Sequence, residues 1–84
     1  MYTIIYSQTA EKQLSKLKRD VQERVISTLE RIRIRPEAYV KRLVGQSCYG
    51  LRVGDYRVLL DIDNDKIMIL ILKIGHRKNV YDSL

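Results

Sequence analysis

The stretch LRVGDYRVL, from Leu51 to Leu59, decides the fold. The dipeptide Gly54-Asp55 interrupts two runs of alternating apolar and polar residues. This is the pattern of two antiparallel strands joined by a two-residue turn, because glycine and aspartate tolerate the left-handed backbone of such turns. We therefore predict strands over Ser47–Val53 and Tyr56–Ile62.

The same turn sets which residues of the two strands face each other. Side chains alternate between the faces of a sheet, so the apolar residues share the core face while Arg52 and Arg57 lie opposite each other on the other face. Like charges in that position repel by roughly 0.2–1 kcal/mol, and a sheet selected only for stability would favour a carboxylate there. Two guanidinium forks suit a phosphate. The alternative is two solvated arginines with their head groups splayed apart.

The residues that follow predict a third strand of the same meander. Asp63-Asn64-Asp65 has turn composition, and Lys66–Ile74 has strand composition. Because Ile67–Leu72 is apolar on both faces, we place this strand in the centre of the sheet.

The N-terminal half predicts one strand and two helices. Residues Tyr2–Tyr6 predict a strand, and two amphipathic helices with apolar stripes follow it. The stripes are Ala10, Leu14 and Leu17 in the first helix, and Val21, Val25, Leu29 and Ile32 in the second. We expect Asp20 to cap the second helix, with Glu23 completing a capping box, and Pro36 to end it near Ile34.

These elements predict a single α+β domain over residues 1–84, since a chain of this length builds one core. An N-terminal strand, a helical hairpin and a three-stranded antiparallel meander form a four-stranded sheet covered by helices on one side. A short C-terminal tail or helical turn follows the last strand.

The composition narrows the functional classes. The formal net charge is +6, from 16 Lys plus Arg and 10 Asp plus Glu, which suits a polyanionic partner such as nucleic acid, an acidic protein or a membrane surface. Cys48 and His76 are the single cysteine and histidine. This argues against a disulfide framework and a zinc site, and suits a reducing cytosol. The longest apolar run has six residues, far fewer than the roughly 20 of a membrane-spanning helix.

The strand topology brings further candidate functional residues near Arg52 and Arg57. The last strand returns to their end of the sheet and brings Arg77 to the same edge. The other residues expected to bind phosphate there are Lys41, Arg42, Lys73, His76 and Lys78. Tyr81 offers a ring to stack on a base or a phenol to donate a proton, and the alternative is an aromatic ring folded onto the core. His76 is a candidate general acid, although strand alternation places it opposite Arg77.

The chain resembles the RelE/ParE superfamily of toxins from toxin–antitoxin pairs. The resemblance covers nearly the whole sequence, from the opening strand Tyr2–Ser7 through Lys41-Arg42-Leu43 to the C-terminal segment. Its most specific parts are LRVGDYRVL at residues 51–59 and GHRKNVY at residues 75–81. It implies the α+β fold already derived from the residues.

The resemblance also implies an activity. RelE-type members are ribosome-dependent mRNA interferases, endoribonucleases that cleave the codon in the ribosomal A site and inhibit translation. The ribose 2′-OH attacks the adjacent phosphodiester, which leaves a 2′,3′-cyclic phosphate and a free 5′-OH. Carried over to this chain, Arg57 would clamp the scissile phosphate, Arg77 would stabilise the transition state and Tyr81 would orient the nucleotide. Arg52 completes this catalytic set, at a place usually held by lysine.

Gly50 departs from the RelE pattern, in which this place holds a lysine proposed to help activate the 2′-OH. Glycine transfers no proton, and arginine is too basic to act as a general base. Catalysis would then rest on positioning and electrostatics, with the base unassigned. Two alternatives stay open: the ParE branch, which shares the fold and poisons DNA gyrase, and a basic RNA-binding relative without catalysis.

The partners implied by the resemblance are the ribosome, mRNA and a RelB-like antitoxin, all in the cytoplasm. The antitoxin should be acidic and partly disordered, and should fold on the toxin. Its helices would displace the segment near Val80–Leu84. No cofactor, metal ion or membrane is expected.

Overall fold

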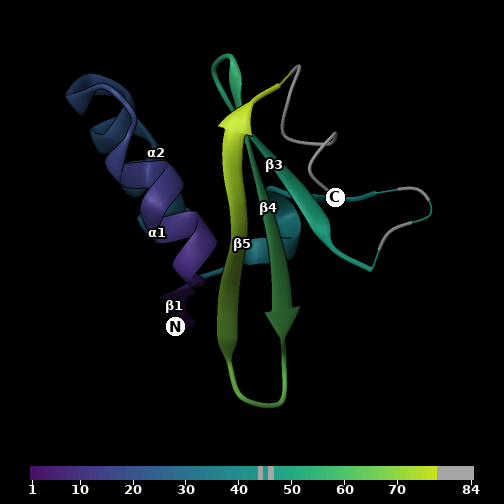
Figure 1. Cartoon of the computed structure of the whole chain (residues 1–84). Helices are drawn as coiled ribbons and strands as arrows, with labels where there is room; N and C mark the ends of the chain where they lie inside the picture. The colour runs from purple at the N-terminus through teal and green to yellow at the C-terminus, as the bar shows by residue number, and fades with distance from the viewer. Residues whose placement is uncertain (44, 46, 78–84) are drawn as a thin grey trace.

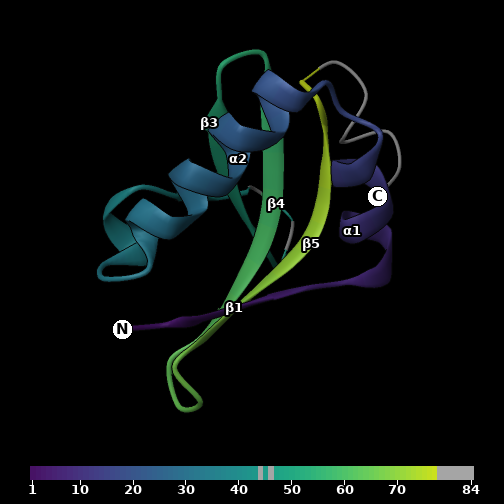
Figure 2. The same cartoon turned by 90° about the vertical axis from the view of Figure 1, so that its left-hand side faces the viewer.

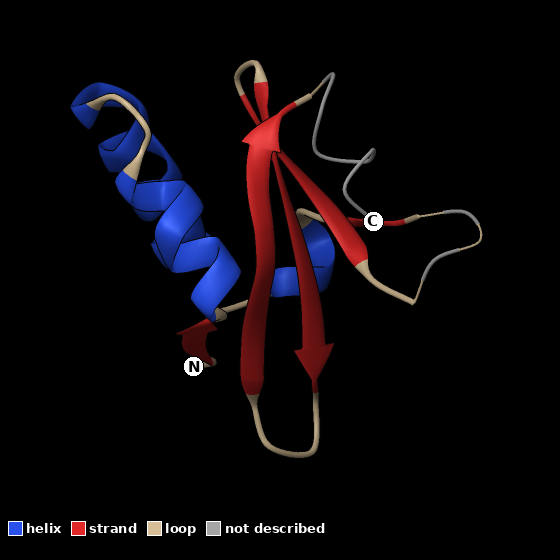
Figure 3. Cartoon of the chain, in the orientation of Figure 1, coloured by secondary structure: helices blue, strands red, loops and turns tan. Residues whose placement is uncertain are grey.

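The computed structural model describes residues 1–43, 45 and 47–77, which form a mixed sheet with both helices on one face (Figure 1, Figure 2). The sheet has five strands in the order β1-β5-β4-β3-β2. The strands are β1 (Thr3–Tyr6), β2 (Lys41–Arg42), β3 (Tyr49–Val53), β4 (Tyr56–Asp63) and β5 (Met68–His76). The helices are α1 (Gln8–Ser15), α2 (Arg19–Ile32) and the short 3₁₀ helix η1 (Pro36–Ala38) (Figure 3). The predicted α+β fold is confirmed.

The β3–β4 hairpin forms in the predicted register. Arg52 pairs with Arg57, and Val53 pairs with Tyr56 across a turn in which Gly54 has a φ of 59°. Glycine adopts this left-handed conformation without the steric cost that a Cβ atom would bring. β4 pairs antiparallel with β5, which pairs parallel with β1 on its other side. β5 is therefore a central strand, as its two apolar faces predicted.

The sheet has one strand more than predicted. Lys41 and Arg42 form β2, a two-residue edge strand that pairs with Gly50 and Tyr49 of β3. Two residues are too few to show a period of alternation, so the sequence pattern carried no signal for this strand. β3 itself begins at Tyr49, two residues later than predicted.

A β-bulge in β5 decides which side chains face the helices. Leu72 is an extra residue relative to the Leu59-Leu60 pair of β4. As a result Ile71 and Ile74 are both buried in the core although they are three residues apart. Strict alternation from Ile71 would have turned Lys73 toward the helices. The bulge instead places Lys73 on the open face of the sheet.

Two side chains satisfy the backbone at this bulge. The Gln13 Oε1 atom accepts the Ile74 N–H at 2.7 Å, and the Ser7 hydroxyl donates to the Leu72 carbonyl at 2.9 Å. Ser7 also caps α1, because its Oγ accepts the Ala10 N–H at 3.0 Å. The start of α1 is thus tied to the irregular part of β5.

α2 begins earlier than predicted and is capped differently. Its first residue is Arg19, and the extended residue Lys18 takes the N-cap position without a side-chain hydrogen bond. The capping box predicted for Asp20 and Glu23 is therefore wrong. Asp20 lies in the first turn of α2, where the positive end of the helix dipole stabilises its carboxylate. Glu23 pairs with Arg19 at 3.5 Å.

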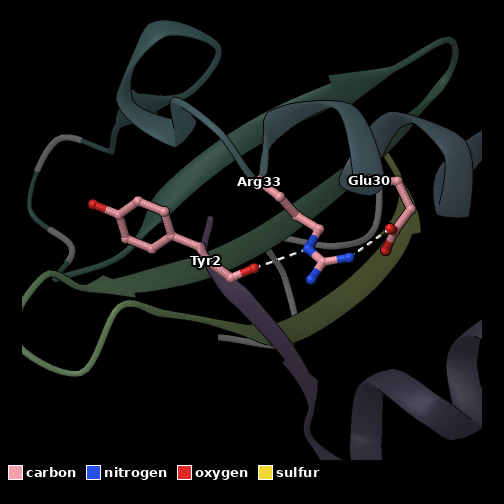
Figure 4. A network of polar contacts seen from close by, with 3 residues as sticks. All are labelled: Tyr2, Glu30 and Arg33. Carbon is pink, nitrogen blue, oxygen red and sulfur yellow. Dashed lines mark hydrogen bonds and ion pairs between the residues drawn. The ribbon is translucent and has the colours of Figure 1, made fainter.

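α2 ends at Ile32, two residues before the predicted end, and its C-cap residue Arg33 is anchored to the N-terminal strand segment. The Arg33 carbonyl accepts the Tyr2 N–H at 2.9 Å. The Arg33 Nε atom donates to the Tyr2 carbonyl at 2.8 Å, and its Nη1 atom pairs with Glu30 at 2.7 Å (Figure 4). This reciprocal contact fixes where the chain leaves the helix.

The hydrophobic core lies between the helices and one face of the sheet. The predicted stripe of α2 is buried at Val25, Leu29 and Ile32, and Val21 packs against it from a partly buried position. The other core residues are Ala10 of α1 and, in the sheet, Leu51, Val53, Val58, Leu60, Ile69, Ile71 and Ile74. No helix formed by the described residues is long and apolar enough to cross a membrane.

The β4–β5 turn holds the one described non-glycine residue with a positive φ, Ile67 at 54°. The Asp63 Oδ1 atom accepts the N–H groups of Asp65 and Lys66 at 3.1 and 3.0 Å, which holds the chain in the turn. β5 therefore starts at Met68 and not at Lys66. A β-branched residue in the left-handed region is strained.

Replacing Ile67 with asparagine should raise the free energy of unfolding by about 1 kcal/mol. The left-handed conformation costs an ordinary residue roughly 1–2 kcal/mol, and asparagine adopts it more readily. Ile67 is 49% exposed, so the change removes little packing. Urea denaturation measures the effect, with Ile34→Asn as the control because Ile34 is exposed and lacks a positive φ. Equal stability of the Ile67→Asn variant and the wild type would contradict the strain.

Candidate functional site

The face of the sheet that the helices leave open carries a cluster of basic side chains. Strand pairing brings Arg52 opposite Arg57, Lys41 opposite Gly50, and Lys73 opposite Leu59. Residues that pair directly lie on the same face, and so do residues two apart on one strand. By this register, four cations share the open face: Lys41, Arg52, Arg57 and Lys73. The structure therefore brings together four of the nine predicted site residues on one surface.

A cleft of about 270 Å³ opens within this surface. Its lining residues are Tyr39, Lys41, Gly50, Arg52 and Arg57. Three of the five carry a positive charge and none carries a carboxylate. The two ion pairs between described residues, Arg19–Glu23 and Arg33–Glu30, both involve α2 and lie outside this lining. The cleft thus concentrates positive charge, and its chemistry suits an anionic ligand.

The two arginines of the cleft differ in how firmly they are held. Arg57 is half-buried, and its Nε atom is fully enclosed. Arg52 is exposed, and its Nε atom donates to the Gly54 carbonyl at 3.3 Å. Arg57 is the more preorganised of the two, since burial restricts its rotamers.

Gly50 forms part of the floor of the cleft. A Cβ atom built at this position would lie 3.1 Å from Leu43 Cδ2 and 3.4 Å from Arg57 Cδ. The absence of a side chain therefore lets Leu43 and Arg57 approach the β3 backbone. It also means that the cleft lacks a side chain at the place where the RelE pattern has a lysine.

His76 is the last residue of β5 and Arg77 follows it, and the two side chains lie in different surroundings. Both side chains are exposed. The Arg77 N–H donates to the Asp55 carbonyl at 2.9 Å, which ties Arg77 to the β3–β4 turn. His76 pairs with Tyr56, which precedes Arg57 and so faces the helix side, and their rings meet edge to face with centroids 5.7 Å apart. His76 is therefore on the opposite face from Arg57.

Arg42 also lies apart from the cleft. It pairs with Tyr49, one residue before Gly50, and its guanidinium lies 5.7 Å from the centroid of the Tyr49 ring. Register thus turns Arg42 away from the open face that holds Lys41. The remaining predicted site residues, Lys78 and Tyr81, fall outside the described residues, and their placement stays a prediction.

The cleft contains one aromatic residue that sequence reasoning missed, Tyr39. It follows η1 and lies two residues before Lys41, a spacing that puts two residues on one face of an extended segment. This two-residue spacing is the sequence signal that places Tyr39 on the same face as Lys41. It was overlooked because β2 itself was not predicted.

Arg24 of α2 is a further basic residue near this end of the sheet, and it is not among the predicted site residues. A Cβ atom built at Gly54 would lie 3.2 Å from the Arg24 Nη1 atom. The Arg24 guanidinium therefore lies over the β3–β4 turn. It adds positive charge to the end of the sheet that carries Arg52 and Arg77.

Comparison with known proteins places this fold and cleft in a family. A family model described as the ParE toxin of the type II toxin–antitoxin system, parDE, matches residues 4–81. A chain of the toxin–antitoxin complex RelBE2 from Mycobacterium tuberculosis is 28% identical with a TM-score of 0.81, over 90% of this chain and 98% of that chain. A chain of the archaeal RelE–RelB complex from Pyrococcus horikoshii OT3 is 26% identical with a TM-score of 0.78, over 94% and 98%.

A third solved structure, the isolated RelE toxin of E. coli, shares the fold. It has a TM-score of 0.79 at 24% identity, over 99% of this chain and 94% of that chain. A search of curated proteins found no match. The family model spans all but the ends of the sequence, and the solved structures share the fold. This chain therefore belongs to the ParE toxin family of type II toxin–antitoxin systems, within the RelE/ParE superfamily.

Proposed function

We propose that this chain is a RelE-like toxin that cleaves mRNA in the ribosomal A site and so inhibits translation. The observation that carries the proposal is the cleft on the open face, where Lys41, Arg52 and Arg57 line about 270 Å³ without a carboxylate. A phosphodiester is the anion that two guanidinium groups and an ammonium group recognise well.

The proposed reaction is an internal transesterification of RNA. The 2′-oxygen of the ribose forms a bond to the adjacent phosphorus, and the bond from phosphorus to the 5′-oxygen of the next nucleotide breaks. The 2′-OH loses a proton and the leaving 5′-oxygen gains one, so the products are a 2′,3′-cyclic phosphate and a 5′-OH. Arg57 would hold the scissile phosphate, and Arg52 and Arg77 would stabilise the negative charge that develops on its oxygens.

Proton transfer is not assigned to a residue of the cleft. Gly50 has no side chain, and the guanidinium groups stay protonated at any physiological pH. The cleft would therefore act mainly by holding the 2′-OH in line with the leaving oxygen and by presenting fixed positive charge. This mode of catalysis depends on the ribosome to deliver the mRNA in the required conformation.

An antitoxin partner forms part of the proposal. The similar chains from M. tuberculosis and P. horikoshii come from toxin–antitoxin complexes. For this chain, with a formal net charge of +6, an acidic RelB-like antitoxin would bind by charge complementarity and cover the cleft. The pair would act in the cytoplasm, where ribosomes and mRNA are found.

A ParE-like DNA gyrase inhibitor is the second candidate. The specific observation in its favour is that the matching family model is that of ParE toxins. Gly50, where RelE has a lysine, also weakens the nuclease constellation. A gyrase inhibitor would use the toxin surface to bind protein, and the basic cleft would then have no role in bond cleavage.

Mapping of mRNA 5′ ends after brief induction of the chain in a bacterial host separates these functions. The proposed function predicts new 5′-OH ends within translated codons, and it predicts their loss when translation is blocked before induction. Gyrase-trapped DNA breaks without such ends would establish the ParE-like function instead. Salt-dependent RNA binding with neither product would leave a binding protein without catalysis.

A further inference from the structure

Tyr39 is an aromatic side chain placed in the basic cleft without a structural task of its own. It lines the cleft together with Lys41, Arg52 and Arg57, and it is 50% exposed. A large exposed aromatic ring is uncommon in this molecule: Tyr39 is the one described tyrosine among its exposed large hydrophobic residues. Its position therefore calls for an explanation other than core packing.

The other described tyrosines all have partners within the fold. Tyr2, Tyr6 and Tyr49 pack against the core cluster, and the ring of Tyr56 contacts His76. Within residues 1–43, 45 and 47–77, by contrast, Tyr39 has neither a side-chain hydrogen bond nor a ring contact. Removing its ring should therefore cost little folding free energy.

The backbone holds Tyr39 firmly although its side chain is exposed. It is the C-cap residue of η1, and its N–H donates to the Pro36 carbonyl at 3.1 Å. Pro36 is itself fully buried and anchors η1 to the body of the domain. Two residues further on, Lys41 enters the sheet opposite Gly50. The ring is thus carried on a segment fixed at both ends, which lowers the entropy cost of binding a ligand.

We propose that Tyr39 is a stacking platform for an unpaired RNA base next to the phosphate held by Arg52 and Arg57. Single-stranded RNA is recognised by such pairing of cationic groups for the backbone with aromatic rings for the bases. Gly50 lines the same cleft between Lys41 and Arg52 in the sheet register and contributes no side chain to it. This inference rests on the proposed function, and it names the ligand class of the cleft as a nucleotide with an exposed base.

Cleavage of mRNA on programmed ribosomes, with the A-site codon either intact or carrying an abasic nucleotide, tests this role. With the intact codon, Tyr39→Ala should lower kcat/KM about 10- to 100-fold, as expected for the loss of one base stack. Tyr39→Phe should stay within about threefold of the wild type, because it keeps the ring. With the abasic codon at the stacking position, the wild type and Tyr39→Ala should cleave equally. Ile34→Ala, another exposed apolar residue near η1, is the control and should have no effect.

Three results would overturn the stacking role. The first is an effect of Tyr39→Ala below twofold, and the second is an equal loss on intact and abasic codons. The third is a Tyr39→Phe variant as impaired as Tyr39→Ala, a result that would assign the role to the hydroxyl.

A readout that needs no cleavage separates this inference from the proposed function. The NMR resonances of the Tyr39 ring should shift with a short single-stranded RNA and not with its abasic counterpart. A wild-type chain that shows this shift without cleaving would retain the base platform and refute the nuclease. Cleavage without the shift would support the nuclease and refute the stacking role of Tyr39.

Discussion

Replacing Arg57 with alanine should lower the rate of A-site cleavage by about 10²- to 10³-fold, the effect typical of losing one fixed charge donor at a reacting oxyanion. Arg57 is the half-buried arginine of the cleft, with its Nε atom enclosed. A guanidinium whose Nε atom is enclosed has restricted rotamers before the substrate binds, so its charge acts on the transition state with little reorganisation. In cells, the same change should abolish growth arrest on induction.

The conservative change Arg57→Lys separates charge from geometry at the same site. Lysine keeps the positive charge but lacks the planar fork that contacts two phosphate oxygens at once. We expect its cleavage rate to fall between those of the wild type and Arg57→Ala. Arg31→Ala removes one exposed cation of α2 outside the cleft and serves as the control for net charge. Circular dichroism verifies that each variant is folded. Cleavage by Arg57→Ala within threefold of the wild type would refute the phosphate-clamp role.

Introducing lysine at Gly50 should raise the cleavage rate about 100-fold, the lower end of what a positioned acid or base contributes. The new ammonium group would lie opposite Lys41 and next to Arg52 and Arg57. Neighbouring positive charges disfavour protonation and lower the pKa of a lysine, so part of the population would be a neutral amine able to accept the 2′-OH proton. The same crowding should reduce the free energy of unfolding by roughly 0.2–1 kcal/mol per like-charged pair.

A matched variant, Gly50→Met, isolates the amine from the added bulk. Both side chains must displace Leu43, whose Cδ2 atom would lie 3.1 Å from the new Cβ, and both crowd the aliphatic part of Arg57. Methionine is an unbranched chain of similar reach without a proton to transfer. We expect Gly50→Met to cleave no faster than the wild type. If Gly50→Lys is also no faster, the missing lysine does not limit the reaction. If both variants are inactive, the glycine is needed for the position of Arg57.

Much of this structure follows from local patterns in the chain. The Gly54-Asp55 turn predicted the β3–β4 register, including the pairing of Arg52 with Arg57, because a two-residue turn leaves one pairing for each strand residue. The stripe at Val25, Leu29 and Ile32 predicted the buried face of α2, because helical periodicity extends over the whole element. The helix start was predicted less well, since Lys18 caps α2 through its backbone conformation and leaves Asp20 inside the first turn.

The cleft itself depended on features without a local pattern. Lys73 reaches the open face because of the bulge at Leu72, and Gln13 and Ser7, distant in sequence, supply the hydrogen bonds that stabilise this irregularity. Tyr39 and Lys41 reach the cleft because a two-residue strand pairs with β3. In each case long-range backbone pairing decides the direction of a side chain.

Local sequence patterns are enough for the α+β class, the hairpin register and the two arginines opposite each other, because periodicity and turn chemistry act over a few neighbouring residues. Only the tertiary fold shows that Lys73 and Tyr39 join those arginines while Arg42 faces elsewhere. One inserted residue reverses the face that the following side chains occupy, and pairing with an edge strand sets the face of residues that show no period of their own. Such shifts are stabilised by contacts between segments far apart in the chain.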